Sequence, residues 1–247
     1  MLSIFLFLLL PLTLTAAQPN PYLFNATTLE KIGIADPAKT VFLFDLHKVV
    51  LKNDTQERIK QIWNLPNKGS LAYLMINPWF IRDVYTMYKD DHRCYEAYIE
   101  QLTEKYPALK PHKLQLLDIG NTHDPYEEVV EILKHLKKKG FRLFIFSNIG
   151  QQTYQVLQKQ MPDLFALFEG AQVCSPANKY ASKPSKIAYL EALNMLRNHG
   201  INTSTTQIIF IDDKKINLPP AQEVGIHALW FNTPYQLRRE LLKIEAL

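Results

Sequence analysis

Four stretches of the sequence place reactive side chains next to apolar runs or in a loop. They are Asp45 after VFLF, Ser147 and Asn148 after FRLFIF, Asp212-Asp213 after QIIFI, and Lys183 before a proline. Burying a carboxylate is costly unless it is paired or bound to a cation. Carboxylates that directly follow apolar runs therefore favour a charged site over an ordinary surface turn.

The three apolar runs are typical of strands buried on both faces of a parallel sheet, because they are short, continuous, and rich in aliphatic and aromatic residues. In open parallel sheets, ligands bind outside the carboxyl ends of the strands. Polar side chains that follow three separate strands can therefore converge on one site.

Helix-like segments alternate with these runs. They are expected at residues 126–139, 151–160, 185–198, 219–224 and after Pro234, with a final strand at 227–231. Gly140 and Gly200 fall just past two of these helices, where a residue free to take positive φ is favoured. This alternation predicts an α/β fold with a doubly wound, Rossmann-like parallel sheet.

Residues 55–124 interrupt the alternation, because their apolar residues fall mainly at helical spacings. We predict a mostly helical insertion here, with residues 18–54 and 125–247 forming the α/β core. Aromatic residues of this segment could line a pocket, but a stripe at helical spacing is more typical of a core.

The order and separation of the strand-end Asp, the strand-end Ser, the Lys-Pro pair and the strand-end Asp-Asp resemble the four motifs of the haloacid dehalogenase-like (HAD) superfamily. The similarity runs from Thr40 to Phe231. FIDDKKINLPPAQEVGIHAL is similar to the fourth motif and its helix, with Asn217 and Gly225 at recurrent positions. The helical insertion resembles the cap module that many members carry between the first two motifs.

The resemblance implies a Mg²⁺-dependent hydrolase, most simply a phosphatase acting on a small phosphorylated molecule. Asp45 would be the nucleophile that forms an aspartyl-phosphate. The phosphoryl group would be bound by Ser147, Asn148 and Lys183. The metal would be held by Asp45, Asp212, Asp213 and the backbone carbonyl of His47, an oxygen-rich set that suits Mg²⁺.

His47 departs from the family pattern. The family's phosphatases usually carry DxDx(T/V), whose second Asp transfers protons, whereas this chain reads Asp45-Leu46-His47-Lys48-Val49. Imidazole, with an ordinary pKa of about 6.5, can act as an acid or base near neutral pH. The open alternatives are a phosphatase with altered acid/base chemistry, a binding protein with little or no turnover, and a dehalogenase. The Asp pair disfavours the last of these, because the family's metal-free dehalogenases need no metal site.

Residues 1–17 form an uncharged apolar segment that ends in Thr15, Ala16 and Ala17, and the first charged residue is Glu30. The apolar run is shorter than the roughly 20 residues that span a bilayer, and the small residues fit a cleavage site. We expect a signal peptide, a mature chain starting at Gln18, and export to the periplasm or medium without a stable membrane span. No Lys or Arg precedes the run, so an N-terminal membrane anchor is the alternative.

The formal charge of +4 is mild, and the dense basic run at 137–139 fits the last turn of a helix. We therefore expect no nucleic-acid partner, and the oligomeric state does not follow from the sequence. Cys94 and Cys174 could form one disulfide in an exported protein, but two cysteines do not define a disulfide framework.

Overall fold

The computed structural model describes residues 29, 33–52, 74, 76–89, 94–119 and 124–247. The predicted signal peptide lies outside these residues, as does the first part of the predicted insertion, residues 55–73. Within the described part of the chain, no helix is both long enough and apolar enough to cross a membrane.

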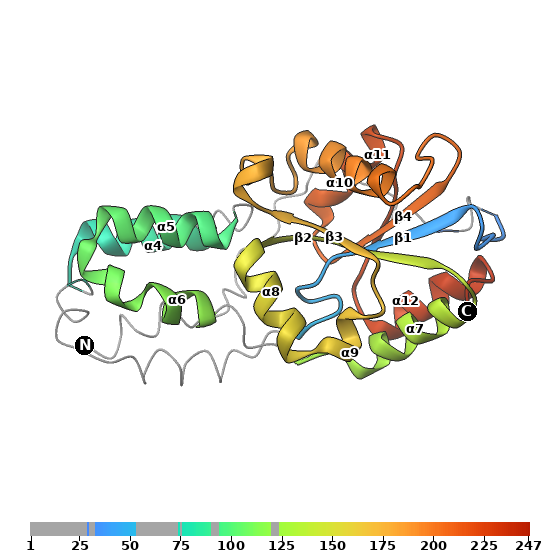
Figure 1. The fold of residues 1–247 in the computed structure, drawn as a ribbon, viewed down its shortest axis with the longest axis horizontal. Helices are drawn as coiled ribbons and strands as arrows, with labels where there is room; N and C mark the ends of the chain where they lie inside the picture. The colour runs from blue at the N-terminus through green and yellow to red at the C-terminus, as the bar shows by residue number, and fades with distance from the viewer. Residues whose placement is uncertain (1–28, 30–32, 53–73, 75, 90–93, 120–123) are drawn as a thin grey trace, which may run out of the picture.

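Five parallel strands form a single sheet in the order β3-β2-β1-β4-β5 (Figure 1). Their bounds are β1 Thr40–Phe44, β2 Arg142–Gly150, β3 Gly170–Cys174, β4 Gln207–Asp212 and β5 His227–Trp230. The four predicted strands are confirmed. The structure adds the edge strand β3, and it extends β2 past its predicted end before Ser147 as far as Gly150.

Helices cover both faces of the sheet (Figure 1). One face carries α7 (Glu127–Lys138), α8 (Gln151–Gln160), α9 (Pro162–Phe165) and α12 (Pro234–Lys243), and the other carries α10 (Lys186–Asn198) and α11 (Leu218–Glu223). The predicted doubly wound α/β fold is confirmed, with helix ends within one or two residues of their predicted positions.

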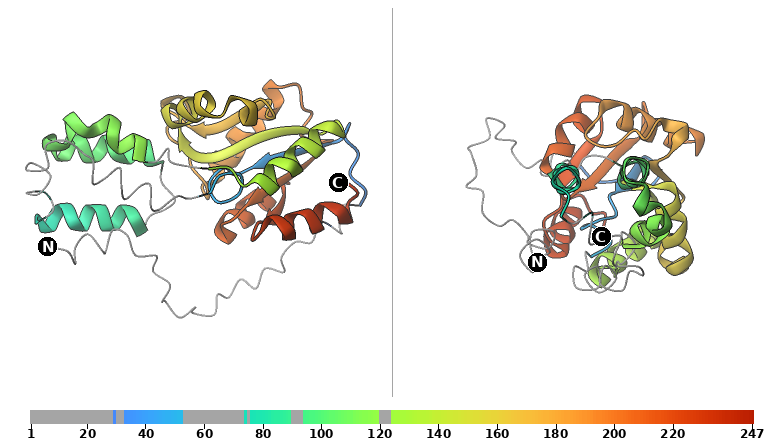
Figure 2. Two further views of the ribbon diagram at one scale, coloured as in Figure 1. Left: turned by 90° about the horizontal axis from the view of Figure 1, so that it is seen from below. Right: turned by 90° about the vertical axis from the view of Figure 1, so that its left-hand side faces the viewer.

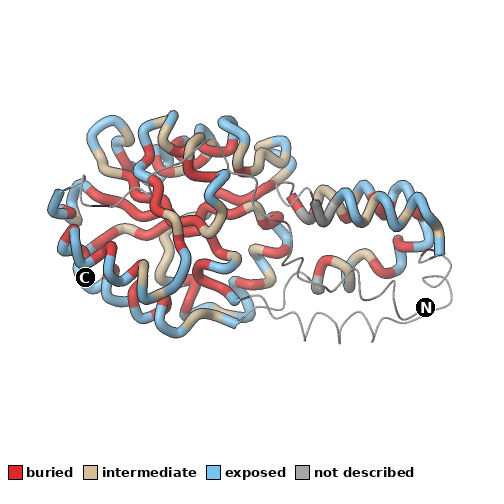
Figure 3. Tube along the Cα trace, turned by 180° about the vertical axis from the view of Figure 1, so that it is seen from behind, coloured by how far each residue is buried: buried red, intermediate tan, exposed pale blue. Residues whose placement is uncertain are grey.

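Alternate residues of β1 pack into two separate hydrophobic cores, one on each face of the sheet. Phe42 and Phe44 pack with α7, α8 and α12, whereas Val41 and Leu43 pack with α10 and α11. All four residues are buried, and Figure 3 shows buried residues along the middle of the sheet. Because both faces are covered, the central strands must be apolar throughout, which explains the uninterrupted runs in the sequence.

Most of the described residues from Leu74 to Ile119 are helical. They form α4 (Pro78–Lys89), α5 (Tyr95–Lys105), the 3₁₀ helix η2 (Pro107–His112) and α6 (Lys113–Ile119), which extend to one side of the sheet (Figures 1 and 2). They share a small core of their own, formed by Leu74, Ile99, Leu102, Tyr106, Leu109 and Leu117. The helical character agrees with the predicted cap, whose limits at residues 55 and 124 stay a prediction.

Glu169 forms ion pairs with the last turn of α7 and with the first residue of β2. Its carboxylate accepts hydrogen bonds from Arg142 Nε at 2.7 Å and from Lys137 Nζ at 3.2 Å. Partial burial opposes the charge of Glu169, but the two ion pairs outweigh it and lower the pKa of the carboxyl below its ordinary 4.5. A carboxyl with a lowered folded-state pKa stabilises the fold above its unfolded pKa, and this contribution is lost as the pH falls through the folded value.

Replacing Glu169 by Gln should therefore lower the free energy of unfolding by about 1 kcal/mol at neutral pH, a value typical of partly exposed ion pairs. The difference from wild type should shrink below the ordinary carboxyl pKa of 4.5. Urea unfolding at neutral and acidic pH measures both effects. The matched control is Glu131→Gln, which breaks only the exposed pair with Lys134. Equal stability of wild type and Glu169→Gln at neutral pH would contradict this role.

Candidate active site

The carboxyl ends of β1, β2 and β4 bring the predicted site residues together. β1 lies between β2 and β4, and the Asp45 N–H donates to Ile211 O at 3.0 Å, which extends the β1–β4 pairing by one residue. Asp45 and Asp212 therefore emerge side by side, and Ser147 stands on the neighbouring strand. Lys183 reaches the same place from the loop that follows β3.

Lys183 is buried between two carboxylates. Its Nζ lies 3.1 Å from Asp45 Oδ1 and 2.7 Å from Asp212 Oδ2, and it donates to Phe146 O at 2.9 Å. The ammonium also lies 5.1 Å from the ring centres of Phe146 and Phe210. Burial disfavours its charge, but Asp212 and Asp45 outweigh this and raise the pKa of Lys183. Lys183 is thus a fixed positive charge.

Asp45 is held in a defined orientation. Its Oδ1 accepts the Leu46 N–H at 2.8 Å as well as facing Lys183, and the Ser147 hydroxyl donates to the same carboxylate. Burial raises the pKa of Asp45, and the neighbouring Asp212 adds to this effect against the opposing influence of Lys183. One ammonium therefore does not fully compensate the carboxylates gathered here.

Asp212 is fully buried, and a set of donors holds both of its oxygens. The Lys214 N–H donates to Oδ1 at 2.8 Å, and Asn217 Nδ2 lies 2.9 and 3.0 Å from Oδ1 and Oδ2. Tyr189 in turn donates its hydroxyl to Asn217 O at 2.7 Å. Asn217 was not among the predicted site residues, although its recurrent position in the fourth motif was a signal for it.

Asp213 completes a group of three carboxylates. Asp45, Asp212 and Asp213 each offer an oxygen, and these atoms all lie within 4.8 Å of one another. Burial, Asp45 and Asp212 together raise the pKa of Asp213 to about 6. Its Oδ1 is buried without a hydrogen-bond partner. An oxygen cluster with excess negative charge and an unpartnered buried oxygen fits a small divalent cation.

Asn148 positions the Lys183 loop. Its Oδ1 accepts the Lys183 N–H at 2.7 Å, and its Nδ2 donates to Lys183 O at 2.8 Å. The Asn148 side chain therefore holds the backbone of Lys183 in place, a contact between residues far apart in the sequence that the sequence does not reveal. Its phosphate-binding role stays a prediction.

His47 lies in the loop that leaves β1, two residues beyond Asp45. The loop closes on itself, because the Lys48 N–H donates to Leu51 O at 2.7 Å and the Leu51 N–H donates to Leu46 O at 2.8 Å. His47 is half-buried there. The turn keeps its backbone close in sequence and space to Asp45, and its predicted metal and proton-transfer roles stay predictions.

Replacing Lys183 by Met should destabilise the fold by about 3–5 kcal/mol, because it leaves two buried carboxylates without their shared cation. Urea unfolding measures this loss of stability. A metal chelator is included so that no bound cation replaces the missing ammonium. The matched control is Lys186→Met, which alters an exposed lysine at the start of α10. Equal stability of Lys183→Met and wild type would contradict a structural role for the buried charge.

Comparison with known protein families identifies one family for this chain. A haloacid dehalogenase-like hydrolase family model matches residues 39–225, well over half of the chain. No curated protein matches the sequence.

Solved structures share the fold at low identity. An L-2-haloacid dehalogenase from Xanthobacter autotrophicus with covalently bound chloropropionic acid is 16% identical, covers 85% of this chain and 84% of its own, and has a TM-score of 0.53. A HAD family enzyme from Bacteroides thetaiotaomicron is 18% identical, with coverages of 81% and 94% and a TM-score of 0.53. Its complex with magnesium and inorganic phosphate is 17% identical, with coverages of 78% and 94% and a TM-score of 0.50. The chain belongs to the haloacid dehalogenase-like hydrolase family.

Proposed function

We propose that this family member is a Mg²⁺-dependent hydrolase of phosphate monoesters that uses Asp45 as its nucleophile. The observation that carries the proposal is the cluster of three carboxylates, Asp45, Asp212 and Asp213, in which Asp213 Oδ1 is buried without a hydrogen-bond partner. A hydrolase that acts without a metal has no need of the third carboxylate. The cluster therefore favours phosphoryl transfer over dehalogenation, even though dehalogenases share the fold.

The proposed reaction has two steps. An oxygen of Asp45 attacks phosphorus, the ester bond breaks, and the alcohol leaves with a proton from an acid group. Water then attacks the aspartyl-phosphate, releases inorganic phosphate and restores the Asp45 carboxylate. The contacts from Leu46 N–H and Lys183 fix the direction of Asp45 before substrate binds, so less ordering remains for the reaction itself.

The positive charge that phosphoryl transfer requires would come from two sources. Lys183 is the permanent one, since the pKa of its ammonium is raised by two carboxylates. Bound Mg²⁺ would supply further charge against repulsion between the nucleophile and the phosphoryl oxygens. Asp45, Asp212 and Asp213 would hold the ion through their carboxylates, and His47 through its backbone carbonyl.

Mg²⁺ should raise the melting temperature of the wild-type protein. A ligand at about one hundred times its Kd adds about 2.7 kcal/mol of stability, which is about 5–10 °C in a chain of this size. Asp213→Asn should abolish the response while leaving the Lys183 pairs with Asp45 and Asp212 in place. Thermal unfolding with and without millimolar Mg²⁺ measures it. If millimolar Mg²⁺ does not change the melting temperature of the wild-type protein, the proposed metal site is contradicted.

The group that donates the proton to the leaving alcohol is not assigned by the fold, because His47 occupies the position at which the family's phosphatases usually have Asp. An imidazolium can protonate a leaving alkoxide, and an imidazole can activate water. If His47 fills neither role, the same site binds a phosphorylated ligand and turns it over slowly or not at all. This second candidate, a binding protein, rests on the residue change at His47.

Wild type should release phosphate from one or more esters in a panel assayed across about pH 4–8 with Mg²⁺, the range in which an imidazole changes protonation. Release should disappear with a chelator and in Asp45→Asn, which removes the nucleophile. The control Asp163→Asn changes an exposed carboxylate on α9 and should behave as wild type.

His47→Asp separates the two candidates in the same assay. If His47 is the working acid and base, the change lowers turnover and displaces the pH profile. If only the usual acid/base is missing, the change raises turnover at least about tenfold, since such catalysis contributes about 10²- to 10⁴-fold. Absence of phosphate release in both proteins, with Mg²⁺ binding intact, would overturn the phosphatase proposal for the esters tested and favour the binding protein. Halide release from a haloacid would instead favour a dehalogenase.

A further inference from the structure

The two cysteines lie on different parts of the fold. Cys94 is the N-cap residue of α5, in the helical insertion, and Cys174 is the last residue of β3, at the edge of the core sheet. Both side chains are buried, with exposures of 2% and 0%, and both are free thiols in the structure. They are the only cysteines in the sequence.

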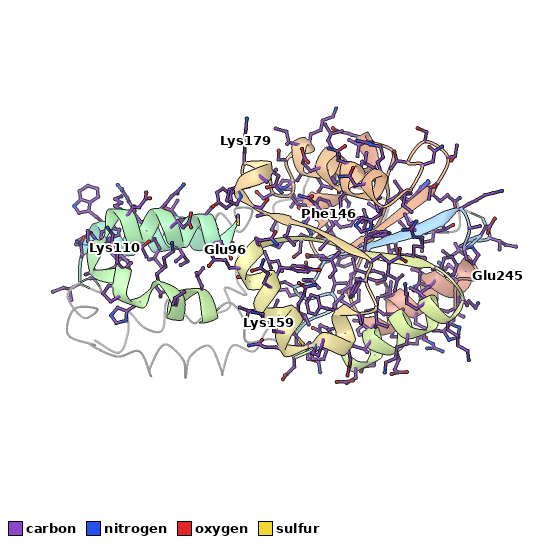
Figure 4. The ribbon with its side chains drawn as sticks, in the orientation of Figure 1. Glu96, Lys110, Phe146, Lys159, Lys179 and Glu245 are labelled. Atoms are coloured by element: carbon purple, nitrogen blue, oxygen red, sulfur yellow. The ribbon has the colours of Figure 1, made fainter. Side chains whose placement is uncertain are left out.

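The packing of α5 against β2 places the two cysteines at one junction. Glu96, two residues after Cys94, accepts the Thr153 N–H at 3.0 Å at the start of α8. A Cβ added to Gly150 would lie 2.6 Å from the Glu96 Cβ, so the two backbones approach closely. Gly150 is also the β2 residue that pairs with Cys174. Figure 4 shows Glu96 at this junction between α5 and the core.

The two thiols are close enough to influence each other's ionisation. The neighbouring Cys174 lowers the pKa of Cys94, whereas the neighbouring Cys94, together with burial, raises the pKa of Cys174. Cys94 also stands at a helix N-terminus, a position that stabilises a thiolate. Cys174 Sγ lies 3.6 Å from Ala181 O and donates to it. The helix N-terminus therefore favours Cys94 as the attacking thiolate.

We propose that Cys94 and Cys174 form a disulfide that fastens the helical insertion to the core beside the active site. The oxidant is a small-molecule disulfide such as oxidised glutathione. The Cys94 thiolate attacks one of its sulfurs and releases a thiolate, and Cys174 then loses its proton and attacks the Cys94 sulfur, releasing the second. Two protein thiols give up two electrons and two protons, and the oxidant becomes two small thiols.

The bond would restrain the insertion at the side of the sheet that carries Ser147. The chain that leaves Cys174 passes Ala181 and reaches Lys183 within the same loop, so the disulfide would also anchor one end of the segment that supplies the buried charge. Because both thiols are buried, the oxidant reaches them before the fold closes. The inference concerns the fold and does not depend on the proposed phosphatase activity.

Refolding the full chain in a mixture of oxidised and reduced glutathione tests the proposal. Thiol titration in denaturant should find no free thiol in the refolded protein, and two after reduction. Peptide mapping without reductant should recover the Cys94 and Cys174 peptides joined to each other. Two titratable thiols in the correctly refolded monomer, or glutathione on each cysteine in place of the bond, would overturn the proposal without any variant being needed.

The stability of the oxidised protein provides a second measurement. Disulfides that close long loops stabilise the folded state, so reduction should lower the melting temperature by roughly 5–15 °C. The variant Cys94→Ala/Cys174→Ala should melt near the reduced wild type and should not respond to reductant. A wild-type melting temperature that is unchanged by reduction would show that the bond does not restrain the fold.

Discussion

The site depends on one electrostatic constraint, the burial of a lysine between two carboxylates from adjacent strands. Lys183 is 1% exposed and Asp212 is 0% exposed, so water screens neither charge. Such an arrangement is stable only if every charge has a nearby partner. A single ammonium faces two carboxylates here, and Asp213 adds a third carboxylate at the edge. This surplus of carboxylates supports the proposed cation site, through which a phosphate would be bound.

Neutral groups set the geometry around this constraint. Asn148 fixes the backbone of Lys183, Asn217 holds both oxygens of Asp212, and Tyr189 holds Asn217. The Tyr189 ring packs edge-on against Phe146 and Phe210, the rings that flank the ammonium of Lys183. The hydrophobic core and the charged site thus share side chains, and a loss of packing on this face would disturb the charges directly.

The sequence predicted most of this arrangement, because buried parallel strands leave a strong local pattern and the polar residues follow them. β3 was missed because GAQVC contains Gly, Ala and Gln and only its last three residues are buried, so it shows no apolar run. The end of β2 was placed too early, since Ser147 and Asn148 look like a loop although the strand continues to Gly150. The contact of Asn148 with Lys183 joins distant residues and leaves no local signal.

Gly150 and Glu96 together place a limit on how this sequence can vary. The Glu96 side chain occupies the space in which any residue other than glycine would put its Cβ, while its carboxylate accepts the Thr153 N–H at the start of α8. A larger residue at 150 is tolerated only if the side chain at 96 becomes smaller or the insertion tilts away from the sheet. Homologues that keep this docking should therefore show correlated changes at the two positions, and those with a larger residue at 150 and an unreduced side chain at 96 should hold their caps at a different angle.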